Sequence, residues 1–383
     1  MKYFPYGHQY ISKGDVDAVV KVLQSDYLTQ GTKIPEFEKL IAKTVGSRYA
    51  VVFNSGTSAL HAAYFASGLG KKDEFITTPM TFVATSNAGL YLGATPIFVD
   101  IDPKTGNIDT DLIENKITKK TKAIMPVHYS GYPVNLIKIH AIAKKYHLKI
   151  IDDASHALGA KYKGEKIGNC KYSDMSVFSF HPVKHITTGE GGAVTTNSKD
   201  YFQNLLVFRT HGISKDNFIK VPDGEWYYEM QLLGYNYRLT DFQAALGISQ
   251  LARLKSNVQR RREIANIYDK AFCDNPYFDY LEEKDKIKSA YHLYTIRLKD
   301  SYKELKKEIF SNLRKGGLGV QVHYIPVYLH PYYQNLNYKK GMCSNAEDFY
   351  QKTISIPMFP SLKNSEINYI IRKIFEVLKS TTK

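Results

Sequence analysis

The feature that most constrains the fold is an alternation of short apolar runs with helix-like stretches between residues 49 and 152. The expected strands are 49–53, 74–78, 96–101, 123–127 and 149–152, and the expected helices are 57–68, 82–92, 109–117 and 136–146. Continuous apolar strands are buried on both faces, and helices between them form βαβ units. The pattern predicts an α/β fold with a mostly parallel central sheet and helices on both faces.

Ligands of such sheets bind beyond the carboxyl ends of the strands. This rule selects the residues that follow the expected strands, namely 54–58, 79–82, His128, 153–156 and 179–184. We expect these segments to line one site.

The rest of the chain predicts flanking structure and a second domain. Helices are expected at 15–24, with Val16, Val19, Val20 and Leu23 on one face, and at 35–45. A strong helix at 239–254 is expected to continue through residue 262, and an α+β pattern follows, with strands at 290–298 and 319–324. A chain of 383 residues can bury a second, smaller core. We predict an N-terminal arm (1–15), a large domain (16–250) and a small C-terminal domain (251–383).

Composition narrows the class of protein. The formal net charge is +15, but the lysines are dispersed and no nucleic-acid-binding motif accompanies them, so no nucleic-acid partner is expected. The N-terminus lacks the apolar core of a signal peptide, and no apolar run is long enough to span a membrane. Three widely spaced cysteines form no metal motif and fit a reducing compartment. The expectation is a cytoplasmic enzyme without a metal.

The segment 178–194 contains a candidate nucleophile. A β-prone run leads into a polar turn with Lys184, and a Gly-rich exit leads to a second β-prone run. A lysine held between buried strands can be desolvated, and its neutral amine then attacks carbonyls. An exposed hairpin lysine is the alternative, because the chain has 52 lysines and arginines.

Two further segments carry polar groups at expected strand ends. Residues 53–60 place Gly56 and Thr57 where a strand opens into a helix, which predicts either a phosphate cradle or an ordinary helix cap. Asp153 follows a buried strand, with His156 three residues later. A buried carboxylate requires a cationic partner, such as a protonated pyridine nitrogen, or it caps the next segment.

One cofactor explains the three segments together. Pyridoxal 5′-phosphate requires a lysine for its Schiff base, an anion cradle for its phosphate and an acid for its ring nitrogen. The order of cradle, Asp153 and Lys184 along the chain resembles that of the fold-type-I, aspartate-aminotransferase-like enzymes of this cofactor.

The sequence resembles the DegT/DnrJ/StrS family of sugar aminotransferases over nearly its whole length. The matching blocks are 54–60, 78–85, 153–156, 179–184 with 187–192, 209–212, 234–238 and 322–324. More narrowly, the chain is similar to the C4 aminotransferases of UDP-4-keto-6-deoxy sugars in pseudaminic acid biosynthesis. Segments 151–160, 107–109, 275–278 and 319–324 carry that narrower match.

The resemblance implies roles for individual residues. Lys184 would bind the cofactor aldehyde and shuttle a proton, and Asp153 would pair with the pyridinium nitrogen. His156 would lie near the cofactor's 3-oxygen, where many relatives have Gln, and Phe82 would stack on the ring. The implied phosphate contacts are Gly56, Thr57 and Ser179, with Asn236 from the other subunit of a homodimer.

The resemblance also implies substrates. The expected partners are a UDP-linked keto sugar and L-glutamate, which becomes 2-oxoglutarate. The candidate sugar-nucleotide contacts are Tyr6, Leu28, Thr29, His181, His323 and Tyr324, although a structural role explains the isolated His and Tyr residues equally well. His185 departs from the family pattern, where Pro or Asn is frequent. Two alternatives stay open, namely an aminotransferase for another 3- or 4-keto sugar nucleotide and a non-catalytic cofactor-binding regulator.

Overall fold

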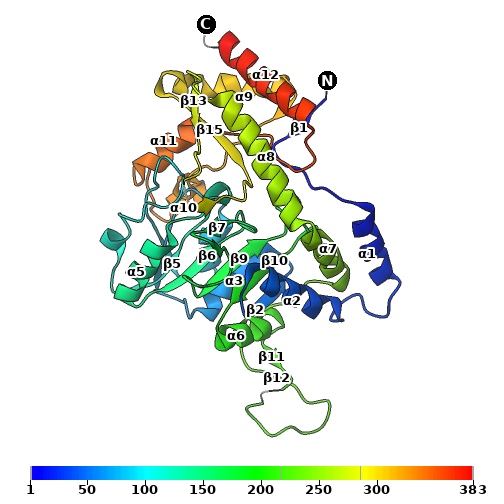
Figure 1. The fold of residues 1–383 in the computed structure, drawn as a ribbon. Helices are drawn as coiled ribbons and strands as arrows, with labels where there is room; N and C mark the ends of the chain where they lie inside the picture. Colours follow the sequence, from blue (N-terminus) through cyan, green and yellow to red (C-terminus); the bar gives the residue numbers. More distant parts are fainter. Residues whose placement is uncertain (1, 217, 285, 382–383) are drawn as a thin grey trace.

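The centre of the molecule is a seven-stranded sheet (Figure 1). The computed structural model describes residues 2–216, 218–284 and 286–381. In spatial order the strands are β2 (Tyr49–Phe53), β10 (Gly192–Thr196), β9 (Met175–Ser179), β6 (Lys149–Asp153), β5 (Thr121–Met125), β3 (Glu74–Thr77) and β4 (Thr95–Phe98). Only β10 runs antiparallel to its neighbours in this sheet. The predicted mostly parallel sheet is therefore confirmed.

Helices pack on both faces of the sheet and bury separate apolar clusters. One face meets α2 (Lys33–Val45) and α5 (Leu136–Tyr146), and the other meets α3 (Gly56–Ala66), α4 (Ala84–Leu90) and α6 (Lys199–Arg209). Neighbouring strand residues divide between the clusters, as for Val52 on the first face and Val51 on the second. Successive side chains of a strand point to opposite faces, so a strand buried on both sides needs this continuous apolar run.

A second core lies in the C-terminal part of the chain. It joins α8 (Leu254–Phe272), α9 (Lys306–Lys315) and α12 (Asn364–Thr381) to a three-stranded sheet. That sheet contains β13 (Phe278–Tyr280), β15 (Tyr294–Leu298) and β17 (Thr353–Ile356). Phe4 of β1 (Phe4–Pro5) enters this core, because β1 pairs with β16 (Leu318–Gly319). The domain boundary between residues 250 and 251 stays a prediction.

The remaining elements connect these two parts. They are α1 (Lys13–Leu23), α7 (Asp241–Ala252), α10 (Pro331–Asn335), α11 (Ser344–Lys352), and the short strands β7 (Lys161–Tyr162), β8 (Glu165–Lys166) and β14 (Ile287–Lys288). Strands β11 (Ile213–Ser214) and β12 (Glu229–Met230) form a hairpin that projects from the body of the molecule (Figure 1). Short 3₁₀ turns occur at Glu114–Lys116, Tyr129–Gly131, Asp300–Leu305 and Val327–Leu329.

The structure corrects the expected helix at 109–117. Only a 3₁₀ turn, Glu114–Lys116, forms there. The backbone amide of Asp109 bonds instead to the Asp100 carbonyl, and the Asp109 carboxylate accepts from the amide of Asp111. Such local side-chain bonds give the backbone an alternative to the helical ladder.

Two other expectations need correction, while the first helix forms as predicted. The helix expected to run from 239 past 254 is broken at Arg253, whose guanidinium binds the buried Asp15 of α1. The strand expected at 319–324 ends at Gly319, and residues 321–324 line a cavity instead. Helix α1 docks through Asp15 and Val22, which leaves the predicted apolar face exposed at Val16, Val20 and Leu23.

Candidate active site

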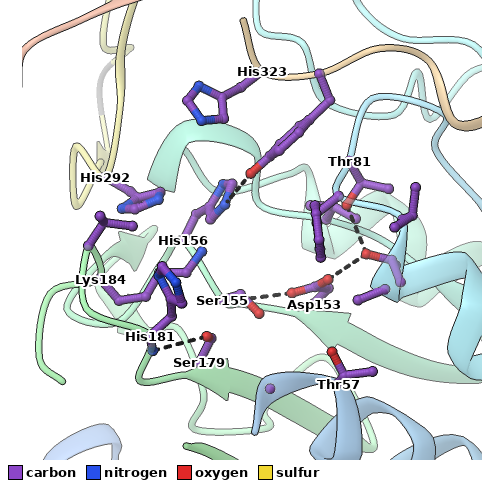
Figure 2. Close-up of a pocket in the computed structure, with 18 of the residues that line it drawn as sticks. Thr57, Thr81, Asp153, Ser155, His156, Ser179, His181, Lys184, His292 and His323 are labelled. Atoms are coloured by element: carbon purple, nitrogen blue, oxygen red, sulfur yellow. Dashed lines mark hydrogen bonds between the residues drawn. The ribbon is translucent and has the colours of Figure 1, made fainter. Parts of the chain in front are cut away.

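A cavity of about 740 Å³ opens at the carboxyl edge of the sheet. Its walls come from the segments after β2, β3, β6 and β9 and from residues 321–325 of the C-terminal part (Figure 2). Parallel strands bring their carboxyl ends to one edge, so the sheet itself gathers segments that are far apart in the sequence. The predicted convergence is confirmed for the segments after these strands, but His128 does not line the cavity. Its ring is buried, and its Nδ1 accepts from the Val134 amide at 3.1 Å.

Lys184 lies in the turn between β9 and β10. Its backbone amide donates to the His181 carbonyl at 2.9 Å, and the Thr188 amide donates to Phe180 at 3.0 Å. These bonds fix the turn, and the side chain lines the cavity. Burial lowers the pKa of Lys184 to about 8, against the opposing effect of the Asp153 carboxylate. The expectation of an ordinary exposed hairpin lysine is therefore wrong.

Asp153 ends β6 and faces the same cavity. Its Oδ2 accepts from the Thr85 hydroxyl at 2.6 Å, and its Oδ1 accepts from the Ser155 amide at 3.1 Å. The Thr85 hydroxyl also contacts that of Thr81 at 2.8 Å. The bonds at both oxygens fix the orientation of the carboxylate, and a carboxylate oxygen can accept further bonds from a cationic group.

The N-terminus of α3 meets the end of β9 at the cavity floor. A capping box between Ser55 and Ser58 uses both of their amides. The backbone amides of Gly56 and Thr57 donate to no acceptor among the described residues. A Cβ atom on Gly56 would lie 3.0 Å from the Cβ of Ser179, so only glycine leaves that space open. Free amides at a helix N-terminus bind anions.

His156 lies above Asp153 among other aromatic rings. Its Nε2 lies 3.0 Å from the hydroxyl of Tyr324, and its ring centroid lies 4.3 Å from that of His292 (Figure 2). Burial holds the pKa of His156 well below its usual range, and the positive charge of Lys184 adds to this effect. His156 is therefore a neutral imidazole at physiological pH.

The structure brings most of the predicted site residues together. Eleven line the cavity: Tyr6, Gly56, Thr57, Phe82, Asp153, His156, Ser179, His181, Lys184, His323 and Tyr324. Leu28, Thr29 and Asn236 do not line it. Thr29 instead pairs with Thr240 in an isolated bridge, and Asn236 is exposed and bridges to Thr210. The functional roles of all these residues stay predictions.

The cavity residues that sequence reasoning did not assign include Thr85, Gln321, His292 and His330. Thr85 lies within the block 78–85 that supported the family resemblance, so its hydroxyl could have been assigned there. Gln321 lies within the segment 319–324 that carried the narrower resemblance, so it too could have been assigned. His292 and His330 have no motif around them, and only the fold brings them to the cavity.

Neither a metal site nor a membrane span is found in the described chain. Residues 2–216, 218–284 and 286–381 contain no group of three or more His, Cys, Asp or Glu side chains arranged to hold a metal ion. Over the same ranges, no helix is long and apolar enough to cross a membrane.

Comparison with known proteins identifies the family. The model of the DegT/DnrJ/EryC1/StrS aminotransferase family matches residues 9–375. The chain is 43% identical over 381 residues to the UDP-4-amino-4,6-dideoxy-N-acetyl-beta-L-altrosamine transaminase of Campylobacter jejuni, covering 99% of this chain and 98% of that one.

Two solved structures share the fold over the whole chain. Helicobacter pylori PseC, an aminotransferase involved in the biosynthesis of pseudoaminic acid, is 39% identical with a TM-score of 0.92 and covers 99% of this chain and 100% of its own. The PLP form of the putative sugar aminotransferase Spr1654 from Streptococcus pneumoniae is 30% identical, with a TM-score of 0.93 and 99% of each chain covered. The predicted fold type I is confirmed, and the chain belongs to the DegT/DnrJ/EryC1/StrS aminotransferase family.

Proposed function

We propose that this aminotransferase moves an amino group from L-glutamate to the C4 keto group of a UDP-linked 4-keto-6-deoxy-N-acetylhexosamine. The cofactor would be pyridoxal 5′-phosphate. The enzyme would act in the cytoplasm, in pseudaminic acid biosynthesis. The observation that carries the chemistry is one cavity in which Lys184, with a lowered pKa, faces Asp153 and a helix N-terminus. The names of the Campylobacter and Helicobacter relatives support the choice of substrate.

The residues of the cavity fit this cofactor. The amides of Gly56 and Thr57, together with the Ser179 hydroxyl, would hold the phosphate at the space that Gly56 leaves open. Asp153 would pair with the ring nitrogen, and its fixed carboxylate supplies the negative charge. Phe82 lines the cavity with an exposed ring that would cover one face of the cofactor.

When bound, pyridoxal 5′-phosphate supplies an aldehyde that exchanges for an amine and a ring that accepts electrons. The chain's own groups do the rest. Asp153 would stabilise positive charge on the ring nitrogen and so keep the ring electron-poor. Lys184 would attack the aldehyde as a neutral amine and then carry a proton to or from the reacting carbon. A pKa of about 8 leaves a useful fraction of that amine neutral at physiological pH.

Substrate binding would use the outer part of the cavity and a second subunit. Tyr6, His181, His323 and Tyr324 would contact the sugar nucleotide from the cavity wall. Asn236 would reach the cofactor phosphate of the partner subunit in a homodimer, because it is exposed and lies outside the cavity of its own chain. Leu28 and Thr29, which are likewise outside that cavity, would contribute to the partner's substrate site.

The decisive experiment combines product analysis with the variant Lys184→Ala. We expect wild-type protein to form a 4-amino sugar nucleotide from L-glutamate and the 4-keto substrate, with ping-pong kinetics. The variant should lose turnover and the visible absorbance of the loaded protein. Lys306→Ala is the matched control, because burial also lowers the pKa of Lys306 to about 8 but Lys306 does not line the cavity.

A panel of keto sugar nucleotides separates the proposal from its alternatives. Exclusive turnover of a different 3- or 4-keto sugar would contradict the proposed substrate but leave the aminotransferase chemistry intact. Protein that binds the cofactor and leaves it unchanged with every amino donor would instead be a regulator. Normal turnover by Lys184→Ala would overturn the assignment of the lysine itself.

A further inference from the structure

Among the described residues, the ring of His156 makes one hydrogen bond and has two aromatic neighbours, of which His292 is the nearer and Tyr324 lies at 6.0 Å between centroids. Its Nε2 meets the Tyr324 hydroxyl at 3.0 Å, while its buried Nδ1 has no partner among the described residues. The ring of His292 packs against it at 4.3 Å between centroids, with a 38° tilt (Figure 2). The bond at Nε2 fixes only one edge of the ring, so the plane of the ring is held by packing, and His292 makes the closest ring contact.

A buried cation, Arg261, fixes the segment that contains His292. Arg261 of α8 is fully buried, and its Nη1 donates to the carbonyls of Tyr291 at 3.1 Å, His292 at 3.2 Å and Met358 at 2.9 Å. A guanidinium away from water is unfavourable unless such bonds satisfy it. The three carbonyls therefore hold the backbone of His292 in one position.

Ser130 and Gly131 fix the same segment at a second place, and Gly131 also lies against His156. The Ser130 hydroxyl donates to the Leu293 carbonyl at 2.8 Å, and the Ala290 amide donates to Gly131 at 3.0 Å. Gly131 has φ +94°, and a Cβ there would lie 2.7 Å from the His156 carbonyl and 3.0 Å from the His292 amide. The backbones of both histidines therefore pack closely against the same glycine, which holds the two segments next to each other.

Both imidazoles are neutral next to Lys184. Burial holds the pKa values of His156 and His292 well below the usual range, and the positive charge of Lys184 acts in the same direction. The buried Nδ1 of His292 also lacks a partner among the described residues, so no recorded hydrogen bond at that atom orients its ring. The two rings are therefore coupled by packing rather than by charge.

We propose that His292 is a positioning residue, whose ring packs on His156 and fixes the orientation in which His156 meets the cofactor beside Lys184. His292 lines the cavity but acts through its neighbour, so its effect depends on the presence of the His156 ring. This inference rests on the proposed function, because it concerns the cofactor that the aminotransferase would bind.

A double-mutant cycle on cofactor affinity tests the coupling. Pyridoxal 5′-phosphate is titrated into cofactor-free wild-type protein and into His292→Ala, His292→Phe, His156→Ala and the double Ala variant. Loss of one aromatic pair predicts that His292→Ala binds the cofactor roughly fivefold more weakly. His292→Phe keeps the ring contact and should retain most of the affinity. In the His156→Ala background, His292→Ala should have no further effect.

His140→Ala is the matched control, because the His140 ring lies 6.0 Å from Tyr172 on the surface and its loss should leave cofactor affinity unchanged. Circular dichroism of each cofactor-free variant checks that it is folded. If His292→Ala does not fold, the test still rests on His292→Phe. Two results would overturn this inference but not the proposed function. In the first, His292→Ala lowers the cofactor affinity equally with and without the His156 ring. In the second, His292→Phe lowers the affinity as much as His292→Ala does. Wild-type protein that failed to bind the cofactor would overturn the proposed function as well.

Discussion

Lys184 reacts with an aldehyde only as a neutral amine, so its pKa sets the pH at which the site becomes reactive. Burial lowers that pKa to about 8, and Asp153 opposes the shift. We predict that reductive methylation of Lys184 with formaldehyde in cofactor-free protein rises with pH and is half-maximal near pH 8. An unperturbed lysine would reach its half-maximum at about pH 10.4. The rate is measured by peptide mass spectrometry.

The contribution of Asp153 has a definite sign. A nearby negative charge favours the protonated amine, so Asp153→Asn should move the half-maximum to lower pH. Asp152→Asn is the control. The Asp152 carboxylate accepts from the Ser176 hydroxyl at 3.1 Å, and it points to the opposite face of the sheet from Asp153 because successive strand residues alternate. A half-maximum that moved to higher pH in Asp153→Asn would contradict the assignment of this charge effect.

At the same scale, the sequence pattern alone predicted cavity residues where motif and strand end coincide, whereas Tyr6 and His323 were expected only from the family resemblance. Asp153, Ser179 and Lys184 follow recognisable apolar strands, so the topology of the sheet alone brings them together. His292 has no such marker. Its place depends on contacts with Arg261 and Gly131, which lie far from it in the sequence. Tertiary contacts of this kind leave no local pattern to detect.

Between elements, α2 depends on α7 for its N-terminal cap. Thr32 makes no side-chain cap, and the Asp241 carboxylate accepts from the amides of Gly31 at 2.8 Å and Lys33 at 2.9 Å. We predict that Asp241→Ala lowers the free energy of unfolding by about 1–2 kcal/mol, the usual cost of a lost cap. Guanidinium denaturation of cofactor-free protein measures this.

Asp200 provides the comparison, because it also lies in the first turn of its own helix, α6, but is exposed. Asp200→Ala should cost only the small interaction with the helix dipole, a few tenths of a kcal/mol. If the two substitutions destabilised the protein equally, the contact between α7 and the start of α2 would contribute nothing.

Element prediction failed where local polar contacts or the cavity replaced regular pairing. Residues 109–117 carry a helix-like pattern, yet Asp109 bonds to its own neighbourhood and only a 3₁₀ turn forms. Residues 320–324 alternate like a strand, but residues 321–324 line the cavity, and the segment pairs with β17 only through an isolated bridge between Gln321 and Ser355. The long strands and helices of the sheet were predictable because burial on both faces leaves a continuous apolar signature.

At the scale of the whole molecule, two groups stand out among the large apolar side chains that the described residues expose. Val16, Val20 and Leu23 form the outer face of α1, and the hairpin of β11 and β12 exposes further large side chains. Val221 is 90% exposed and Trp226 is 76% exposed. Neighbouring exposed apolar side chains are typical of an interface with another protein, and they support the proposed homodimer.

Subunit complementation tests whether Asn236 acts across that interface. Lys184→Ala and Asn236→Ala should each impair the homodimer. Co-expression with two different tags yields the mixed dimer, in which one of the two sites has both an intact Lys184 and an intact partner Asn236. We predict roughly half of wild-type activity for that dimer. The control pairs Lys184→Ala with Asp153→Asn, which line the cavity of the same chain and should not complement each other. If Asn236 served its own subunit, the first pair would stay as inactive as the control, since each site would then keep one of the two defects.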